Sequence, residues 1–114
     1  MLFICYPKCS ICQKAKKWLD NHEAVYTERH IVDNNPGYEE LKEGYQKSGL
    51  PLKRFFNTSG ILYREMKLKD QLPQMSEDEQ LKLLATNGML VKRPLLITEE
   101  KVLVGFKQAE WENL

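Results

Sequence analysis

The sequence predicts an α/β fold with one mixed four-stranded sheet, built from a βαβ unit at the start of the chain and a ββα unit at its end. Three observations favour this. Short apolar runs bounded by turn residues lie near the two ends of the chain, helix-forming segments fill the middle, and the 114 residues suffice for one domain. We therefore expect a single domain over residues 1–114, with a helical insertion at about 36–88.

The opening βαβ unit is predicted from two apolar runs around one amphipathic segment. "LFICY" (2–6) is apolar and rich in aromatic residues, as is typical of a buried strand. "SICQ" then has the form of a capping box, with Ser10 as the N-cap and Gln13 at the third helical position. One helix face would carry Ile11, Ala15, Trp18 and Leu19. "AVYTERHIV" (24–32) predicts a second strand, parallel to the first.

The middle of the chain predicts a series of helices. Asn35 and Pro36 resemble an N-cap followed by a first helical residue. Further helical segments are "PLKRFF", "ILYREMKLKD" and "SEDEQLKLLATNG". The last has a second capping-box pattern, at Ser76 and Glu79, and a stop at Asn87-Gly88.

The end of the chain returns to strands. "PLLIT" and "KVLVGF", separated by "EEK", predict a β-hairpin, and "KQAEWENL" predicts a short final helix. A βαβ…ββα order around one mixed sheet, with a Cys-x-x-Cys at the first strand–helix junction, is the thioredoxin-like plan.

Composition and charge exclude several classes of protein. Hydrophobic residues make up 42% and charged residues 29%, which favours a globular domain over a disordered chain. The net charge of +1 gives no global attraction to nucleic acid or membrane, and no basic reading helix for direct DNA binding is visible. No apolar run reaches the roughly 18 residues of a membrane span, and the start lacks a secretory signal. We expect a cytoplasmic monomer.

Cys9 and Cys12 are the strongest candidates for chemistry. At a helix N-terminus, free N–H groups and the helix dipole favour a thiolate. Helical residues three apart have Cβ atoms about 5–6 Å apart, and a disulfide needs about 3.5–4.5 Å, so a small adjustment would join the two sulfurs. The pattern predicts that Cys9 attacks an oxidised substrate and that Cys12 resolves the adduct by forming a Cys9–Cys12 disulfide. Lys8 adds a nearby positive charge.

Two alternatives remain for this pair. Half a zinc site would need a second pair of ligands, and Cys5, His22 and His30 offer none with suitable spacing, so we expect no metal. Two inert core cysteines are the other alternative, since free cysteine packs as a small hydrophobe. Cys5 itself lies within an apolar run and is expected in the core.

Three segments, "YPKCSICQKAKKWL", "LKRFFNTSG" and "VKRPLLI…KVLVGF", together resemble the ArsC/Spx family, which includes arsenate reductases and the Spx/MgsR transcriptional regulators. The resemblance covers nearly the whole chain. It implies a thioredoxin-like fold with a helical insertion, a nucleophile at Cys9 and an arginine–cis-proline pair at Arg93-Pro94. Arg93 would clamp an oxyanion or help to hold a thiolate. We place Lys8, Ser10 and Pro94 in the substrate-binding part of the site.

The chain departs from this pattern at two positions. Arsenate reductases of this type resemble one another in surrounding the oxyanion with three arginines, of which this chain has only Arg93. Asn57 and Gly105 stand at the other two positions. Each lost charge-assisted bond costs about 1.5–3 kcal/mol, which Lys53 or Arg54 could offset.

Three functions therefore follow from the residues and the resemblance. The first, which we favour, is a small thiol-disulfide reductase without a bound cofactor, recharged by an external thiol reductant (thioredoxin, glutaredoxin or a low-molecular-weight thiol). The second is a redox-sensing regulator that binds the C-terminal domain of the RNA polymerase α subunit, as the Spx branch implies. The third is an arsenate reductase.

Overall fold

The sheet has the predicted composition and connectivity. A computed structural model describes residues 1–114 and contains four strands in the order β2-β1-β3-β4. The strands are β1 (Leu2–Cys5), β2 (Thr27–His30), β3 (Leu95–Ile97) and β4 (Val102–Val104). β1 pairs with β2 in parallel, and both the β1–β3 and β3–β4 pairs are antiparallel. The mixed thioredoxin-like sheet and the late hairpin are thus confirmed.

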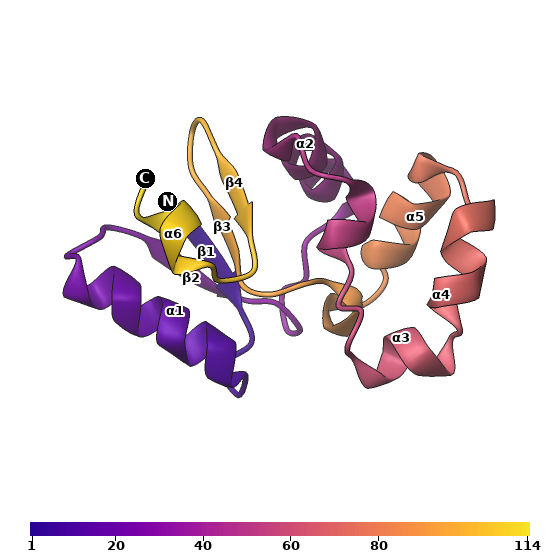
Figure 1. Ribbon diagram of the computed structural model, residues 1–114, viewed down its shortest axis with the longest axis horizontal. Helices are drawn as coiled ribbons and strands as arrows, with labels where there is room; N and C mark the ends of the chain where they lie inside the picture. The colour runs from indigo at the N-terminus through magenta and orange to yellow at the C-terminus, as the bar shows by residue number, and fades with distance from the viewer.

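Helices divide into those beside the sheet and those between β2 and β3. α1 (Ser10–Asn21) joins β1 to β2, and α6 (Gln108–Trp111) follows β4. The segment between β2 and β3 contains α2 (Tyr38–Ser48), α3 (Ile61–Glu65), α4 (Leu68–Gln71), α5 (Glu77–Leu84) and the 3₁₀ helices η1 (Leu52–Phe55), η2 (Leu72–Gln74) and η3 (Gly88–Leu90). Figure 1 shows the sheet, α1 and α6 at one end of an elongated molecule and α3, α4 and α5 at the other. No helix combines the length and the apolar character needed to cross a membrane.

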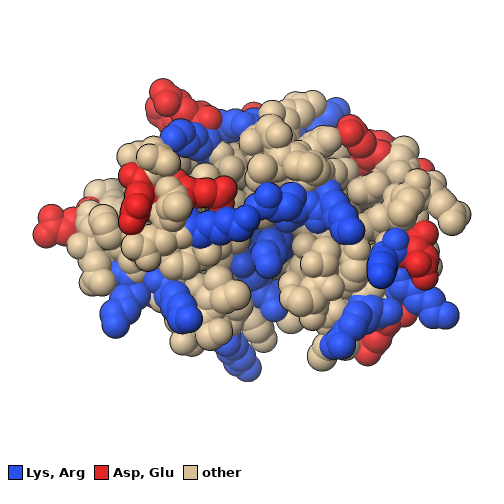
Figure 2. All heavy atoms as spheres, viewed as in Figure 1, with Lys and Arg blue, Asp and Glu red and all other residues tan.

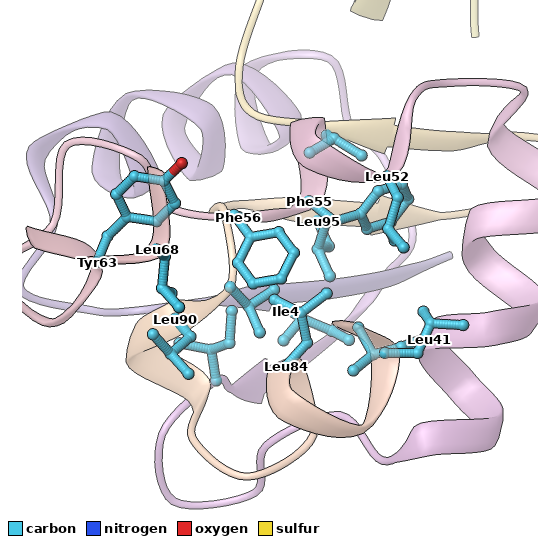
Figure 3. Packing of buried hydrophobic residues seen from close by; sticks show 14 of the residues in the cluster. Ile4, Leu41, Leu52, Phe55, Phe56, Tyr63, Leu68, Leu84, Leu90 and Leu95 are labelled. Atoms are coloured by element: carbon cyan, nitrogen blue, oxygen red, sulfur yellow. The ribbon is translucent and has the colours of Figure 1, made fainter. Parts of the chain in front are cut away.

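Alternation along β1 divides the core into two clusters, one on each face of the sheet. Ile4 belongs to the larger cluster, where it meets Leu95 of β3 and side chains of η1 and α5 such as Phe55 and Leu84 (Figure 3). The smaller cluster lies under α1 and α6 and contains Phe3, Cys5, Cys12, Ala15, Leu19, Leu96 and Trp111. Cys12 is therefore part of the packing that holds α1 on the sheet.

α1 differs from its prediction at its first turn. The cap is Cys9, and Ser10 is the first helical residue, so the predicted capping box of Ser10 and Gln13 is wrong. The reason is a turn that holds Cys9 in extended conformation, because its N–H donates to the Tyr6 carbonyl oxygen at 2.9 Å. The buried face is consequently Cys12, Ala15 and Leu19. Ile11, predicted on that face, is 44% exposed.

α2 begins two residues later than predicted. Its cap is Gly37 rather than Asn35, and its first helical residue is Tyr38 rather than Pro36. The Asn35 side chain is used elsewhere, since its amide nitrogen donates to the Ala85 carbonyl oxygen at the end of α5, at 2.8 Å. Asn35 therefore ties the loop after β2 to α5 instead of capping α2.

Two other predicted elements are shorter or interrupted. The second strand covers Thr27–His30 rather than 24–32, and Val25 is 86% exposed. "ILYREMKLKD" forms two short helices, because Lys67 adopts a left-handed conformation (φ 53°) between them. A regular helix cannot continue through that conformation.

α5 has the predicted start and an earlier end. The Glu79 N–H donates to the Ser76 hydroxyl at 3.1 Å, and the Ser76 N–H donates to the Glu79 carboxylate at 3.0 Å, so this capping box is confirmed. The helix ends at Leu84 rather than at Asn87-Gly88. Asn87 instead caps η3, and Gly88 lies against the loop after β2, where a Cβ would come within 1.8 Å of the Ile31 carbonyl oxygen.

Candidate functional site

Cys9 occupies the junction between β1 and α1. Its carbonyl oxygen accepts the first helical hydrogen bond, from the Gln13 N–H at 3.0 Å, and no side-chain oxygen caps the helix. The first N–H groups of α1 are therefore open to the Cys9 sulfur. The Cys9 side chain is half-buried, so it is both supported by the fold and accessible.

The surroundings of Cys9 favour its thiolate form. Partial burial raises the pKa of Cys9, but hydrogen bonds from the backbone N–H groups of Cys12 and Ile11 lower it. The Arg93 side chain and the Cys12 thiol add to them, and the net result is a pKa of Cys9 below the ordinary cysteine value. Helix-terminal N–H groups and a neighbouring arginine are known to lower thiol pKa values.

Cys12 is in the opposite situation. It is 2% exposed, and burial is the main cause that raises its pKa to about 12. The Tyr6 N–H donates to the Cys12 sulfur at 3.4 Å and lowers the pKa of Cys12 in part. The negative charge on Cys9 raises it further. The two thiols, three residues apart, thus have pKa values displaced in opposite directions.

Cys5 is a core residue, as expected from its apolar flanks. It is 3% exposed, and burial raises the pKa of its thiol to about 11. All three cysteines are free thiols in this structure. No group of three or more His, Cys, Asp or Glu side chains is arranged to hold a metal ion.

Arg93 is held next to the cysteine pair. Its guanidinium carbon lies 5.2 Å from the centroid of the Tyr6 ring, in cation–π range. The Arg93-Pro94 peptide bond is cis, as the family resemblance implied. The Nη1 atom of Arg93 is buried and has no hydrogen-bond partner. A charged donor without a partner is suited to an anionic group of a substrate.

A cavity of about 340 Å³ opens beside Cys9. Its lining combines Cys9 with two cationic side chains, Lys92 and Arg93, and with the polar Asn57. The apolar part of the lining consists of Ile11, Ile61, Leu62 and Met89. The volume falls within the range of small-molecule pockets, about 300–1,000 Å³. A larger cavity, of about 810 Å³, lies between the chain termini and the β3–β4 turn and contains no cysteine.

The residues selected from the sequence are only partly brought together. Cys9, Asn57 and Arg93 line the Cys9 cavity, and Cys12 is buried next to Cys9. Lys8, Ser10 and Pro94 are not in its lining: the first two are exposed, and Pro94 is buried. Arg54 and Lys53 line a separate cavity of about 370 Å³ that shares Lys92 with the first.

Sequence reasoning did not select Lys92, although it directly precedes Arg93. A Cβ at Gly105 would lie 3.3 Å from the Lys92 Cε, so the lysine side chain passes beside Gly105. Gly105 is the position at which the resemblance places an arginine. Lys92 therefore brings a cation close to that position from a different point in the chain.

Comparison with known proteins places the chain in a family. The model of the ArsC family matches residues 5–114. The chain is 58% identical over 113 residues to "Uncharacterized protein YusI" of Bacillus subtilis (strain 168), covering 99% of this chain and 96% of that protein. It is 29% identical over 110 residues to "Regulatory protein MgsR" of the same organism, covering 96% of this chain and 86% of that protein. The solved structure of a possible arsenate reductase from Streptococcus mutans UA159 has a TM-score of 0.91 and 44% identity, covering 99% and 97%. This chain belongs to the ArsC family.

Proposed function

We propose that this protein is a thiol-disulfide reductase in which Cys9 is the nucleophile and Cys12 is the resolving cysteine. One observation carries the proposal: the pKa of Cys9 is lowered and that of Cys12 is raised, although the two thiols lie three residues apart. This asymmetry favours Cys9 over Cys12 as the attacking thiolate, and the raised pKa keeps Cys12 protonated at neutral pH. Only the thiolate attacks a disulfide.

In the first step, the Cys9 thiolate attacks one sulfur of a substrate disulfide. A bond forms between the Cys9 Sγ and that sulfur, the substrate S–S bond breaks, and the second half of the substrate leaves as a thiolate. Lys92 and Arg93, which line the same cavity, stabilise the negative charge that moves from Cys9 to the leaving sulfur.

In the second step, Cys12 resolves the adduct. Once Cys9 is in a mixed disulfide it no longer carries a negative charge, so one of the causes that raise the pKa of Cys12 is removed. The Tyr6 N–H remains to stabilise the Cys12 thiolate. Cys12 gives its proton to solvent and its thiolate attacks the Cys9 Sγ. The bond between Cys9 and the substrate sulfur breaks, and the first half of the substrate leaves as a thiolate. The substrate gains two electrons, and the protein loses two in forming the Cys9–Cys12 disulfide.

The cycle closes when an external thiol reductant reduces this disulfide. Thioredoxin, glutaredoxin or a low-molecular-weight thiol would supply the two electrons by the same exchange chemistry. The reductase thus needs no bound cofactor.

The test uses the reduced protein with bis(2-hydroxyethyl) disulfide, followed by thiol release and mass spectrometry. Wild type should form the internal disulfide and release both halves of the reagent. Cys12→Ser should stop at a mixed disulfide on Cys9, and Cys9→Ser should not react. Cys5→Ala is the matched control, because Cys5 shares the smaller core cluster with Cys12 but does not line the Cys9 cavity. This variant should react like wild type. An unreactive wild type, or equal reaction of Cys9→Ser and wild type, would refute the proposal.

A redox-sensing regulator is the second candidate, favoured by the similarity to MgsR. In that case the Cys9–Cys12 disulfide is a switch, and the partner is the C-terminal domain of the RNA polymerase α subunit. Pull-down of that domain by the reduced and the oxidised protein decides between the two functions. Binding that changes with oxidation in wild type, but not in a Cys9→Ser variant, supports the switch. Equal binding, or none, excludes it.

Arsenate reduction is the third candidate, favoured by the likeness to the possible arsenate reductase from Streptococcus mutans. Here Cys9 would attack arsenate, and Lys92 with Arg93 would be the cations available to the oxyanion in the cavity. Arsenate is added to the same assay in place of the disulfide, with a thiol reductant and detection of arsenite. Arsenite formation that requires Cys9 supports this activity, and its absence removes arsenate reduction as a candidate.

A further inference from the structure

A second cavity, adjoining the Cys9 cavity, has a basic lining. It measures about 370 Å³, and its charged residues are Lys53 and Arg54 from η1 and Lys92 from the segment before β3. Main-chain bonding holds these two segments together, because the Lys92 N–H donates to the Phe55 carbonyl oxygen at 2.8 Å. The three cationic residues therefore lie on two backbone segments that are held together, although Lys53 and Lys92 lie far apart in the sequence.

The charges in this cavity are not neutralised within the protein. Its lining contains no acidic residue, and the four ion pairs of the molecule involve none of Lys53, Arg54 and Lys92. The whole chain has a net charge of only +1, so three cations in one cavity are a local concentration. Figure 2 shows Lys and Arg side chains gathered across the middle of one face of the molecule. Such a cavity attracts anions.

Its position relates this cavity to the chemistry. Lys92 lines both the basic cavity and the Cys9 cavity, so the two cavities meet at this lysine. Each cavity lies at the lower end of the range of small-molecule pockets, so a ligand with a sulfur at one end and acidic groups at the other could use both. Specific protein partners cover a broad surface of roughly 800 Å² instead.

We propose that the two cavities together bind a low-molecular-weight thiol in its disulfide form. Its sulfur lies at Cys9, and its carboxylate or phosphate groups lie at Lys53, Arg54 and Lys92. The inference rests on the proposed reductase activity and names the substrate class for it. The Cys9 thiolate attacks one sulfur of this disulfide, a Cys9–sulfur bond forms as the S–S bond breaks, and the other half leaves as a thiolate. Cys12 then gives its proton to solvent and attacks the Cys9 Sγ, which breaks the mixed disulfide, releases the second half as a thiolate and forms the Cys9–Cys12 disulfide.

The experiment measures second-order rate constants for oxidation of the reduced protein by three disulfides. Glutathione disulfide carries carboxylates, coenzyme A disulfide carries phosphates, and bis(2-hydroxyethyl) disulfide is neutral. Lys53→Gln/Arg54→Gln should slow the reaction with the preferred charged disulfide by about tenfold or more. The neutral disulfide should react at the wild-type rate, which also shows that the variant is folded. The charged disulfide that loses more rate identifies the anion as carboxylate or phosphate.

The matched control is Lys17→Gln/Lys42→Gln, which changes the net charge equally at exposed positions outside both cavities. It should leave all three rates unchanged. Equal slowing by both double variants, or equal slowing of the neutral disulfide, overturns the inference while the reductase activity stands. A disulfide-bonded acidic peptide that reacts faster than both small charged disulfides also overturns it, in favour of a protein substrate. A wild type that reduces none of the disulfides refutes the proposed function itself.

Discussion

The starts of α1 and α5 have nearly the same sequence pattern and different structures. Ser10 and Gln13 repeat the spacing of Ser76 and Glu79. At α5 the serine hydroxyl and the glutamate carboxylate each accept one backbone N–H, and the helix is capped by oxygen atoms. At α1 the cap is Cys9, and no oxygen takes the free N–H groups.

One helix start therefore contributes to the stability of the fold, and the other contributes to the reactivity of Cys9. The oxygen atoms at α5 satisfy N–H groups that would otherwise lack partners, which stabilises the helix. At α1 the corresponding N–H groups lower the pKa of Cys9 instead. A helix start that lacks an oxygen cap is less stable and has its dipole free to hold a thiolate. Four substitutions test this separation, and their expected effects decrease in the order Cys9→Ser, Arg93→Gln, Ser76→Ala and Ser10→Ala.

Cys9→Ser should separate the two properties completely. A serine hydroxyl is not ionised at neutral pH, so alkylation by iodoacetamide under conditions that label wild type should fall by about two orders of magnitude or more. Serine is a good N-cap, so the free energy of unfolding should stay equal or rise. Urea denaturation and timed alkylation measure both quantities. A clear loss of stability would mean that the Cys9 sulfur contributes to the fold rather than to reactivity.

Arg93→Gln should weaken the thiolate without removing it. Hydrogen bonding from the Arg93 side chain lowers the pKa of Cys9, so replacing the guanidinium with a neutral amide should raise that pKa. Alkylation at neutral pH should become several-fold slower, and the pH–rate curve should move to higher pH. Well above both pKa values, the variant should react as fast as wild type or faster. Arg64→Gln, an exposed arginine at the end of α3, is the control; the same shift there would contradict a specific role for Arg93.

Ser76→Ala should affect stability alone. Removing one partner of the α5 capping box should lower the free energy of unfolding by about 1 kcal/mol. Urea denaturation with an unchanged m-value measures this effect, and the alkylation rate of Cys9 should not change. A stability equal to that of wild type would show that the box forms without contributing.

Ser10→Ala should have the smallest effect. Ser10 is exposed and lies within the first turn rather than at the cap, so the free energy of unfolding should change by less than about 0.5 kcal/mol. Comparison with Ser76→Ala in the same urea series tests the assignment directly. A loss as large as that of Ser76→Ala would place the cap of α1 at Ser10.

The fold was predictable where pattern and packing agree. The alternation of Ile4 with Phe3 and Cys5 suits a strand buried on both faces, and the structure places these side chains in the two core clusters. The first turn of α1 was not predictable. A serine three residues before a glutamine has the capping-box pattern whether the helix is capped at Ser10 or, as in the structure, at Cys9. The hydrogen bond from the Cys9 N–H to the Tyr6 carbonyl oxygen makes Cys9 the cap. Main-chain turns of this kind have no clear sequence pattern.

The site was predictable only in part. The spacing of Cys9 and Cys12 indicated two thiols at a helix start, and the resemblance added Arg93. Lys92 was missed because the sequence does not show which cavity a side chain lines. In the structure Lys92 lines the Cys9 cavity and lies beside Gly105. Lys8 was chosen for its nearness in sequence, but residues next to a nucleophile in the chain need not face the same cavity.

The most direct test of the account is a pH titration of the three thiols followed by NMR of ¹³Cβ-labelled cysteine. It reports each ionisation separately in the unmodified protein. Cys9 should titrate first, below the ordinary cysteine value of about 8.5, while Cys5 and Cys12 remain protonated through that range. A Cys9 pKa at or above the ordinary value, or ionisation of Cys12 before Cys9, would contradict the assignment of nucleophile and resolving cysteine.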